Sequence, residues 1–312
     1  MRIEYHRTLI GDRVRIAAYY DALAKVIRKG ETIVADIGTG TGILAFLAAK
    51  LGAKKVYAYE MSEIGAVAEK LKTLNKIRSV ELIPGRSTDN IDPPRVDVVV
   101  TETLGNFALE EFLVETMNDA RARYLRPGGV LIPNAVSQFA APVISPRLFE
   151  ELTVWDRVGY GLDLTPARVM SLNNVYIRTL KQAELIDSGR SAKVWDAVDF
   201  TKQNRLSRKG TVEWTLRDKA TVYGLAVWWT ASLSPPVTLT TSPLAAPTHW
   251  EQLFFPTLEP LQLAAGDTLC AEIHTKSSEA GGTDIAWSFV VRGAKGRERD
   301  RQALSLTKGF LP

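Results

Sequence analysis

Three carboxylates lie in apolar surroundings within the segment VDVVVTETLGNFALEE, residues 96–111. Glu102 directly follows an apolar strand, and Glu110 and Glu111 come after a loop that contains Gly105. Burying two like charges together is unfavourable unless a cation neutralises them. A planar guanidinium suits such a pair best, because its forked N–H donors bind carboxylates bidentately. The segment therefore indicates a guanidinium site at Glu102 and Glu111. An exposed acid at Glu110 and a helix N-terminal acid at Glu111 are the simpler alternatives.

A glycine-rich turn in the segment VADIGTGTGIL forms a second candidate site. Gly38, Gly40 and Gly42 follow a β-branched strand and precede a helix rich in Ala and Leu. Without Cβ atoms, the backbone can approach a ligand closely at the carboxyl edge of a sheet, where open α/β folds bind ligands. The third glycine comes one residue earlier than in the dinucleotide fingerprint G-x-G-x-x-G, and this spacing argues against NAD.

Two acids stand near that turn. Asp36 lies at the end of the first predicted strand, and Glu60 ends the second in VYAYE. A carboxylate at the second position can accept hydrogen bonds from both hydroxyls of a ribose. A tight turn without a ligand would explain the glycines alone, but Glu60 at the end of the next strand favours a nucleoside ligand.

The elements that must position these residues alternate between strand and helix. Residues 1–30 predict one or two helices, and the strand–helix alternation that follows predicts a parallel sheet with helices on both faces. Pro133 and Asn134 close this part of the chain. Its five predicted strands are TIVADI, KKVYAYE, VELIPG, RVDVVVTE and GGVLIP.

The second half of the chain has a different texture. Residues 145–166 mix helix and turn, and from about Val175 the chain becomes a series of short strands rich in Val, Thr and Trp, such as TVYGLAVWWTASL. Turn residues separate these strands, which predicts an antiparallel β-sandwich or barrel. We therefore expect two domains, at residues 1–134 and 135–312, as the length of 312 residues also suggests.

The composition is that of a soluble globular protein, with 46% hydrophobic and 24% charged residues. No apolar run reaches the length of about 18 residues that a spanning helix needs. The charged N-terminal segment lacks the apolar core of a signal peptide, so a cytoplasmic location is expected. Cys270 is the single cysteine, which excludes intrachain disulfides, and with only three histidines no metal site is expected.

The net charge of +4 and the pI near 9.0 are mildly basic. A positive surface could favour nucleic acid. However, the basic residues are scattered among 35 acids, and acids interrupt the longest basic cluster, RGAKGRERDR. We therefore interpret the charge as an ordinary solvated surface and expect neither nucleic acid nor membrane as a partner.

The glycine turn resembles motif I of class I S-adenosylmethionine-dependent methyltransferases. Three further segments resemble signatures of the protein arginine N-methyltransferase family. TETLGNFALEE is similar to the double-E loop, in which two glutamates nine residues apart hold the substrate guanidinium. Thr248, His249 and Trp250 match a Thr-His-Trp signature, and HRTLIGDRVR is similar to H-x-x-M-L-x-D-x-x-R. The matches run from residue 6 to residue 250 in the expected order, so the resemblance covers essentially the whole chain.

The resemblance implies a role for each matching residue around S-adenosylmethionine and its product S-adenosylhomocysteine. Arg15 would pair with the methionyl carboxylate, and Glu60 would hold the ribose. The cofactor would be lined by Asp36, Gly38 and Gly40.

On the substrate side, the resemblance implies that Glu102 and Glu111 clamp the guanidinium and keep electron density on the attacking nitrogen. Glu102 would also border the cofactor. His249 would pair with Asp12 beneath the site and help to remove the proton, and Trp250 would line the arginine channel.

The implied fold is a Rossmann-like domain followed by an antiparallel β-barrel, with a helical dimerisation arm near Arg147–Asn173. The arm implies a head-to-tail homodimer. Three features depart from the family pattern. The printed sequence begins five residues before His6 and shows no Y-F-x-x-Y helix; Leu9 replaces a pocket methionine; and Thr88, next to Asp89, stands where an adenine-contacting glutamate is expected.

The leading hypothesis is methylation of peptidyl arginine. Methylation of free arginine or another small guanidino compound is the main alternative, because the lid motif is missing and a basic protein mildly repels arginine-rich tails. A catalytically silent dimeric relative is a second alternative. A nucleic-acid methyltransferase would be expected to carry an Asn/Asp-Pro-Pro-aromatic motif after the fourth strand, where this chain has TETLGN.

Overall fold

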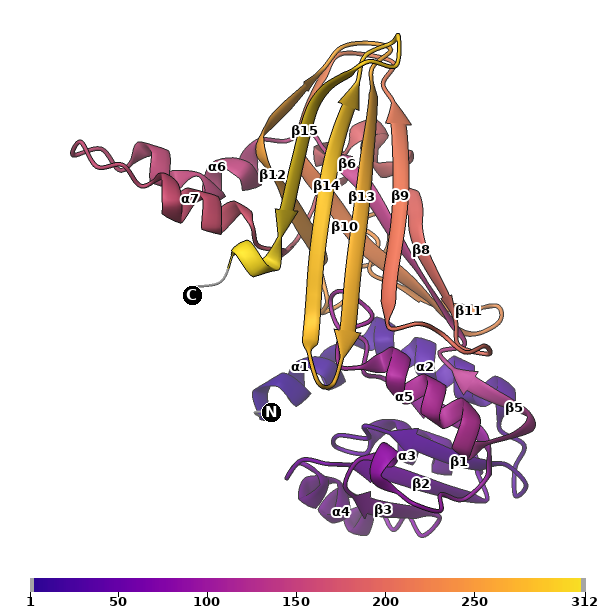
Figure 1. The fold of residues 1–312 in the computed structure, drawn as a ribbon. Helices are drawn as coiled ribbons and strands as arrows, with labels where there is room; N and C mark the ends of the chain where they lie inside the picture. The colour runs from indigo at the N-terminus through magenta and orange to yellow at the C-terminus, as the bar shows by residue number, and fades with distance from the viewer. Residues whose placement is uncertain (1–2, 310–312) are drawn as a thin grey trace.

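The computed structural model describes residues 3–309, and a parallel sheet forms its first half (Figure 1). Five strands pair in parallel in the order β3-β2-β1-β4-β5. All five strands predicted from the alternating pattern are present. They are β1 (Ile33–Ile37), β2 (Lys55–Glu60), β3 (Val80–Pro84), β4 (Val96–Thr101) and β5 (Leu125–Ile132).

The helices of this half begin and end where local chemistry favours it. The Asp12 side chain accepts a hydrogen bond from the Arg15 backbone N–H at 2.9 Å and caps the second helix. Gly52, after the third helix, has φ +97°, a left-handed conformation that suits glycine at a helix end. The helices are α1 (Ile3–Gly11), α2 (Arg13–Val26), α3 (Ile43–Lys50), α4 (Gly65–Leu74) and α5 (Leu113–Asp119), and α5 continues as a π-helical turn over Ala120–Tyr124.

Two antiparallel sheets form the second half. One has the order β7-β12-β10-β6-β8, with β11 paired to β10, and the other has the order β15-β14-β13-β9. Strands β8 and β9 lie side by side and join the two sheets into the predicted barrel-like domain (Figure 1). The strands are β6 (Ala135–Val143), β7 (Tyr176–Arg178), β8 (Lys193–Asp199), β9 (Ser207–Thr215), β10 (Ala220–Ser234), β11 (Val237–Thr240), β12 (Gln252–Leu263), β13 (Thr268–Ser278), β14 (Gly282–Arg292) and β15 (Glu298–Ser305).

A helical arm projects from the β domain (Figure 1). It contains α6 (Arg147–Leu152) and α7 (Thr165–Leu172), within the segment predicted as the arm. Leu148, Phe149, Leu152 and Leu172 anchor its base in a second hydrophobic cluster. The connection between the two helices carries exposed apolar side chains, at Val154, Trp155, Val158, Tyr160 and Leu162.

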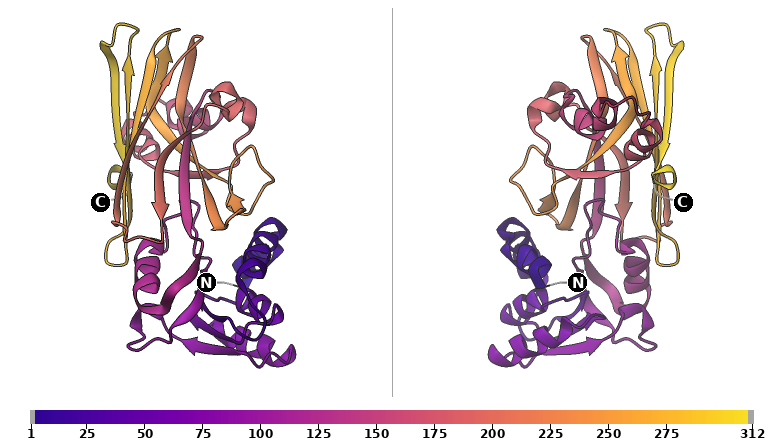
Figure 2. Two further views of the ribbon diagram at one scale, coloured as in Figure 1. Left: turned by 90° about the vertical axis from the view of Figure 1, so that its right-hand side faces the viewer. Right: turned by 90° about the vertical axis from the view of Figure 1, so that its left-hand side faces the viewer.

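The two halves share one hydrophobic core. Helix α2 packs against β10 and β11, and the tip of the β13–β14 hairpin reaches down to the parallel-sheet half beside α5 (Figures 1 and 2). Both halves can therefore contribute side chains to one cavity between them. Among residues 3–309, no helix is both long enough and apolar enough to cross a membrane.

Candidate active site

A cavity of about 850 Å³ opens at the carboxyl edge of the parallel sheet, below the β domain. Its volume lies in the range of small-molecule sites. The glycine turn, the ends of β2 and β4, helix α1, the start of α5 and the β13–β14 hairpin all line it. The residues predicted for the site that reach its surface are Leu9, Arg15, Gly38, Gly40, Glu60, Thr88, Glu102 and Glu111.

The glycine turn brings bare backbone to the cavity. Gly38 and Gly40 have φ values of +73° and +57°, a region that side chains disfavour. A Cβ atom at Gly38 would lie 3.0 Å from the Thr103 side chain, and one at Gly40 would lie 3.2 Å from His6. The turn therefore requires glycine for both its conformation and its space.

Glu60 is fixed at the end of β2. Its Oε2 accepts a hydrogen bond from the Gly40 N–H at 2.8 Å, and its Oε1 accepts bonds from the N–H and hydroxyl of Ser62 at 2.8 and 2.5 Å. These bonds tie the carboxylate to the glycine turn. A carboxylate offers about four acceptor positions, so about one remains for a ribose hydroxyl beside these three bonds, and a second would become available where the Ser62 hydroxyl turns away.

Asp36 lies behind the turn instead of on the cavity surface. It is 1% exposed, and its Oδ2 accepts a hydrogen bond from the Thr39 hydroxyl at 2.6 Å. Burial raises its pKa to about 6, although that hydrogen bond opposes the rise. In this structure Asp36 supports the turn, whereas the sequence predicts direct contact with the cofactor.

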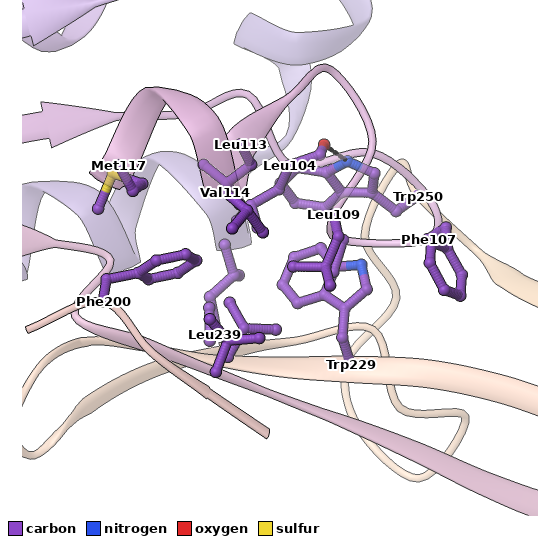
Figure 3. Close-up of a cluster of buried hydrophobic side chains, with 14 of the residues drawn as sticks. Leu104, Phe107, Leu109, Leu113, Val114, Met117, Phe200, Trp229, Leu239 and Trp250 are labelled. Atoms are coloured by element: carbon purple, nitrogen blue, oxygen red, sulfur yellow. Dashed lines mark hydrogen bonds between the residues drawn. The ribbon is translucent and has the colours of Figure 1, made fainter. Parts of the chain in front are cut away.

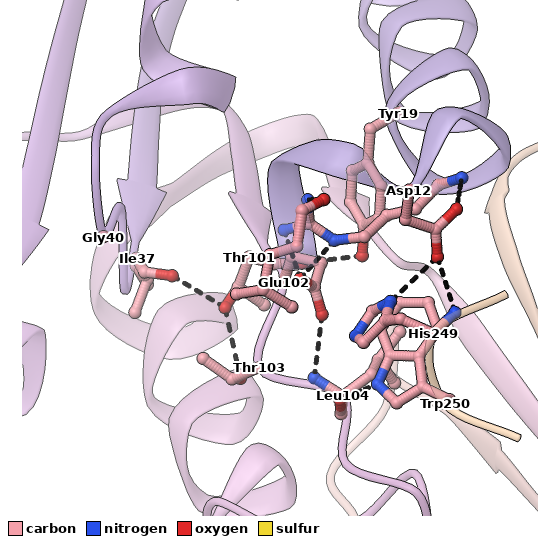
Figure 4. Close-up of polar contacts among 12 residues, drawn as sticks. Asp12, Tyr19, Ile37, Gly40, Thr101, Glu102, Thr103, Leu104, His249 and Trp250 are labelled. Carbon is pink, nitrogen blue, oxygen red and sulfur yellow. Dashed lines mark hydrogen bonds and ion pairs between the residues drawn. The ribbon is translucent and has the colours of Figure 1, made fainter. Parts of the chain in front are cut away.

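Glu102 lies on the cavity floor as one member of a buried ion pair (Figure 4). The Arg15 and Glu102 side chains are each 5% exposed, and Arg15 Nε donates to Glu102 Oε2 at 2.5 Å. Arg15 also donates to the Leu9 carbonyl oxygen at 3.1 Å. Burial raises the pKa of Glu102 to about 7, despite the opposing charge of Arg15.

Glu111 lies at the cavity rim. The residue is exposed, yet its carboxylate is screened enough from water that burial raises its pKa, with smaller contributions from Glu110 and Glu60. Its backbone has φ +54°, and the next residue, Phe112, has φ +61°. Glu110 points into the loop instead, where it accepts a hydrogen bond from the Phe107 N–H at 3.3 Å. Of the two neighbouring acids, Glu111 is the one that faces the cavity.

Asp12 and His249 form a buried pair beneath the floor (Figure 4). Asp12 Oδ2 lies 2.8 Å from His249 Nδ1 and accepts the His249 backbone N–H at 3.0 Å. Burial lowers the pKa of His249, which Asp12 only partly offsets, so the ring is neutral at neutral pH. Burial acts to raise the pKa of Asp12, but the hydrogen bonds from Arg15 and His249 outweigh it and lower the pKa.

Trp250 also lies behind the cavity, whereas the sequence predicts it on the arginine channel. It is 2% exposed, and its indole Nε1 donates to the Leu104 carbonyl oxygen at 2.7 Å (Figures 3 and 4). Leu104 follows Glu102 by two residues, and its N–H donates to Glu102 Oε1 at 3.4 Å. The indole therefore supports the loop that carries the catalytic candidates.

The sequence patterns did not predict one wall of the cavity. Glu279, Gly282 and Thr283, at the tip of the β13–β14 hairpin, line it. The Glu279 side chain pairs with Arg86, and its N–H donates to Glu115 Oε2 at 2.8 Å. The segment SEAGG signals a turn, but no local pattern indicates that this turn reaches Glu115, 164 residues earlier in the chain.

Comparison with known proteins gives matches along the whole chain. The sequence family described as the arginine methyltransferase oligomerization subdomain matches residues 135–293, and that of ribosomal protein L11 methyltransferase matches residues 18–137. Protein arginine N-methyltransferase 1 of Saccharomyces cerevisiae is 30% identical over 311 residues, covering 95% of this chain and 88% of that protein. Its namesake in Schizosaccharomyces pombe is 31% identical over 301 residues, covering 92% and 87%.

Solved structures share the fold. The Trypanosoma brucei PRMT1 enzyme–prozyme heterotetrameric complex with AdoHcy superposes with a TM-score of 0.85 at 22% identity, over 98% of both chains. Arabidopsis thaliana protein arginine methyltransferase 10 gives 0.82 at 23% identity, again over 98% of both. The protein therefore shares their fold, a Rossmann-like parallel-sheet half followed by a β domain. With relatives matching nearly its whole length, the chain belongs to the protein arginine N-methyltransferase family.

Proposed function

We propose that the protein transfers a methyl group from S-adenosylmethionine to a guanidino nitrogen of peptidyl arginine. The observation that carries the proposal is the position of Glu102. It is buried, paired with Arg15, and lies in the same cavity as the glycine turn and Glu111. A cationic substrate held there would lie beside a cofactor on the turn, which supplies the proximity that a transfer reaction needs.

The residues present fit the cofactor. The glycine turn offers a cradle that Cβ atoms would fill, and Glu60 is oriented by bonds from Gly40 and Ser62. His6 lines the same cavity, and its buried Nε2 has no hydrogen-bond partner within residues 3–309. Arg15 offers a positive charge for a carboxylate at the floor. When bound, the cofactor supplies an electrophilic methyl group on a sulfonium.

The glutamates would hold and orient the guanidinium. Binding of a cation lowers the pKa of a neighbouring carboxyl, so Glu102 becomes anionic as the substrate enters. Glu111 would supply the second carboxylate from the rim. The bound cofactor would supply its methyl group to a nitrogen of the guanidinium that these glutamates hold, and one proton would leave that nitrogen. His249, kept neutral and fixed by Asp12 beneath the floor, would help to remove this proton.

Incubation with methyl-labelled S-adenosylmethionine tests the proposal. An arginine-rich peptide and free L-arginine are compared in parallel, and label in the peptide is the expected result. Label only in free arginine would make the protein a small-molecule methyltransferase. Label in neither, with S-adenosylhomocysteine still bound in calorimetry, would identify a catalytically silent relative.

The proposal extends to assembly. We propose a head-to-tail homodimer in which the arm, about residues 147–173, contacts a second copy of the chain. Tyr160 is 93% exposed and Leu162 is 64% exposed at the end of the arm, and a partner would cover them. Light scattering at micromolar concentration should give a dimer, and a monomer would contradict the assignment.

We also propose a division into two domains and a cytoplasmic location for the protein. We place the cofactor-binding domain at residues 1–134 and the β-barrel substrate domain at residues 135–312. The change from parallel pairing in β5 to antiparallel pairing in β6 supports this boundary. A cytoplasmic location is tested by fractionation of cells that express the chain.

A further inference from the structure

Two indole groups of the β domain bind consecutive carbonyl groups of the double-E loop, residues 102–111. Trp250 Nε1 donates to the Leu104 carbonyl oxygen at 2.7 Å, and Trp229 Nε1 donates to the Gly105 carbonyl oxygen at 3.0 Å. The two indoles pack edge to face with ring centroids 5.0 Å apart (Figure 3). Trp250 belongs to the Thr-His-Trp signature, whereas Trp229 lies in β10, outside every motif found in the sequence.

The Gly105 carbonyl oxygen accepts two hydrogen bonds that hold this loop together. Besides the bond from Trp229, its oxygen accepts the Ala108 N–H at 2.9 Å, so both lone pairs are used. Gly105 has no space for a side chain, because a Cβ atom would lie 1.9 Å from Glu110 Oε2. The bond from Trp229 therefore acts on the turn that reverses the chain between Glu102 and Glu111.

The conformation of the loop needs such support. Ala108, Glu111 and Phe112 all have positive φ, at +59°, +54° and +61°. Non-glycine residues in this region are strained and persist only where surrounding contacts hold them. Glu111 is exposed at the rim, whereas Leu104, Ala108 and Leu109 of the same loop are buried, so the loop packs into the protein through its middle part.

We propose that Trp229 is a positioning residue that sets the distance between the Glu102 and Glu111 carboxylates. The inference rests on the proposed arginine methylation, because these carboxylates are the guanidinium clamp. Loss of the indole N–H would leave the Gly105 carbonyl with one bond fewer and free the turn. The clamp would then hold the guanidinium less well in the transition state, while Glu60 would keep its bonds from Gly40 and Ser62.

The test uses Trp229→Phe with Trp228→Phe as its matched control. Trp228 is the preceding residue on the same strand and is 3% exposed, but it faces the opposite side and stacks on Phe139. We expect Trp229→Phe to lower kcat by about tenfold or more, in line with the sensitivity of transfer reactions to misplacement. The dissociation constant of S-adenosylhomocysteine should stay within about twofold, and Trp228→Phe should keep its kcat.

Trp229→Phe also leaves a void in the core, so a second variant that preserves the volume of the side chain is needed. Replacement of Trp229 by 3-benzothienylalanine keeps the bicyclic ring and lacks only the N–H donor. The same fall in kcat is expected from it. Wild-type kcat in this variant, or equal losses in the Phe variants of both tryptophans, would overturn the positioning role.

Hydrogen–deuterium exchange separates this inference from the proposed function. Amides of residues 103–112 should exchange at least about threefold faster in both Trp229 variants than in wild type or Trp228→Phe. Faster exchange in a protein that methylates no arginine would sustain the loop anchor and refute only the function. Unchanged exchange in an active enzyme would refute the anchor and leave the function standing.

Discussion

Glu102 and Glu111 belong to one loop but lie in different environments. On the floor, Glu102 is 5% exposed on its side chain, lies at the end of β4 and pairs with Arg15. At the rim, Glu111 is exposed, has a left-handed backbone and belongs to a loop that the β domain anchors at Gly105. The ion pair on the floor thus lies within the parallel-sheet half, with His249 and Trp250 of the β domain beneath it, whereas the loop that carries the rim is itself held by an indole of the β domain.

This difference separates two kinds of control over the reaction. Residues on the floor lie beside charged side chains that are in place before a ligand binds. Substitutions there should therefore change turnover or cofactor affinity strongly. Residues at the rim act through contacts that are partly exposed to water and should have graded effects. Substitutions on each side can test whether this division holds.

The largest effect is expected on the floor, at Glu102. Glu102→Gln keeps the shape and removes the charge, so kcat should fall by about a hundredfold or more, as for other groups that stabilise transition-state charge. The affinity for S-adenosylhomocysteine, measured by calorimetry, should stay within about threefold. Glu110→Gln, a glutamate of the same loop that points away from the cavity, is the control. Normal turnover by the Glu102 variant would remove it from the clamp.

Cofactor affinity should show the second largest effect. Glu60→Ala removes the carboxylate assigned to the ribose, and loss of charge-assisted hydrogen bonds should weaken S-adenosylhomocysteine about ten- to a hundredfold. At saturating cofactor, kcat should largely recover, because Glu60 does not touch the guanidinium. The exposed neighbour Glu63→Ala provides the comparison. Equal affinities for both variants would exclude Glu60 from the ribose role.

Glu102 on the floor should also control the pH dependence of kcat/KM. Burial raises the pKa of Glu102 to about 7, so the carboxyl is protonated below that pH and its charge is lost. We expect kcat/KM to fall by about tenfold per pH unit below 7, since this parameter reports the free enzyme. A profile that stays flat down to pH 6 would show that Glu102 titrates in its ordinary range.

Floor and rim also differ in how far the sequence could predict them. Glu60 ends β2 and Glu102 directly follows β4, and parallel strands end at one edge, so local pattern alone placed both. The wider spacing of the double-E loop predicted Glu111, but not its exposure or its left-handed backbone. Those features depend on how the loop is anchored by tertiary contacts.

Local sequence patterns could not predict the positions of three other residues of the site. Trp229 lies in a buried strand whose pattern indicates only a core position, and its bond to Gly105 joins residues 124 apart in the chain. Asp36 and Trp250 were predicted as surface residues of the cavity because a motif names a residue without its orientation. In the structure both lie one layer behind it, where they support the backbone that forms the wall.

The smallest effect should come from the β13–β14 hairpin at the rim. Glu279→Arg opposes Arg86, whereas the double variant with Arg86→Glu restores an opposite-charge pair. The two side chains are 51% and 36% exposed, and such pairs are worth little in water. We therefore expect the single variant to weaken S-adenosylhomocysteine by only about two- to fivefold, and the double variant to recover it at low salt.

Salt makes this last test informative. An exposed ion pair is screened as ionic strength rises, so the difference between the single and double variants should shrink in 0.5 M NaCl. The hydrogen bond from the Glu279 N–H to Glu115 survives both substitutions and should keep the hairpin near the cavity. A loss as large as that of Glu60→Ala, insensitive to salt, would mean that the hairpin touches the cofactor directly. The β13–β14 hairpin would then belong to the cofactor site and not only to its rim.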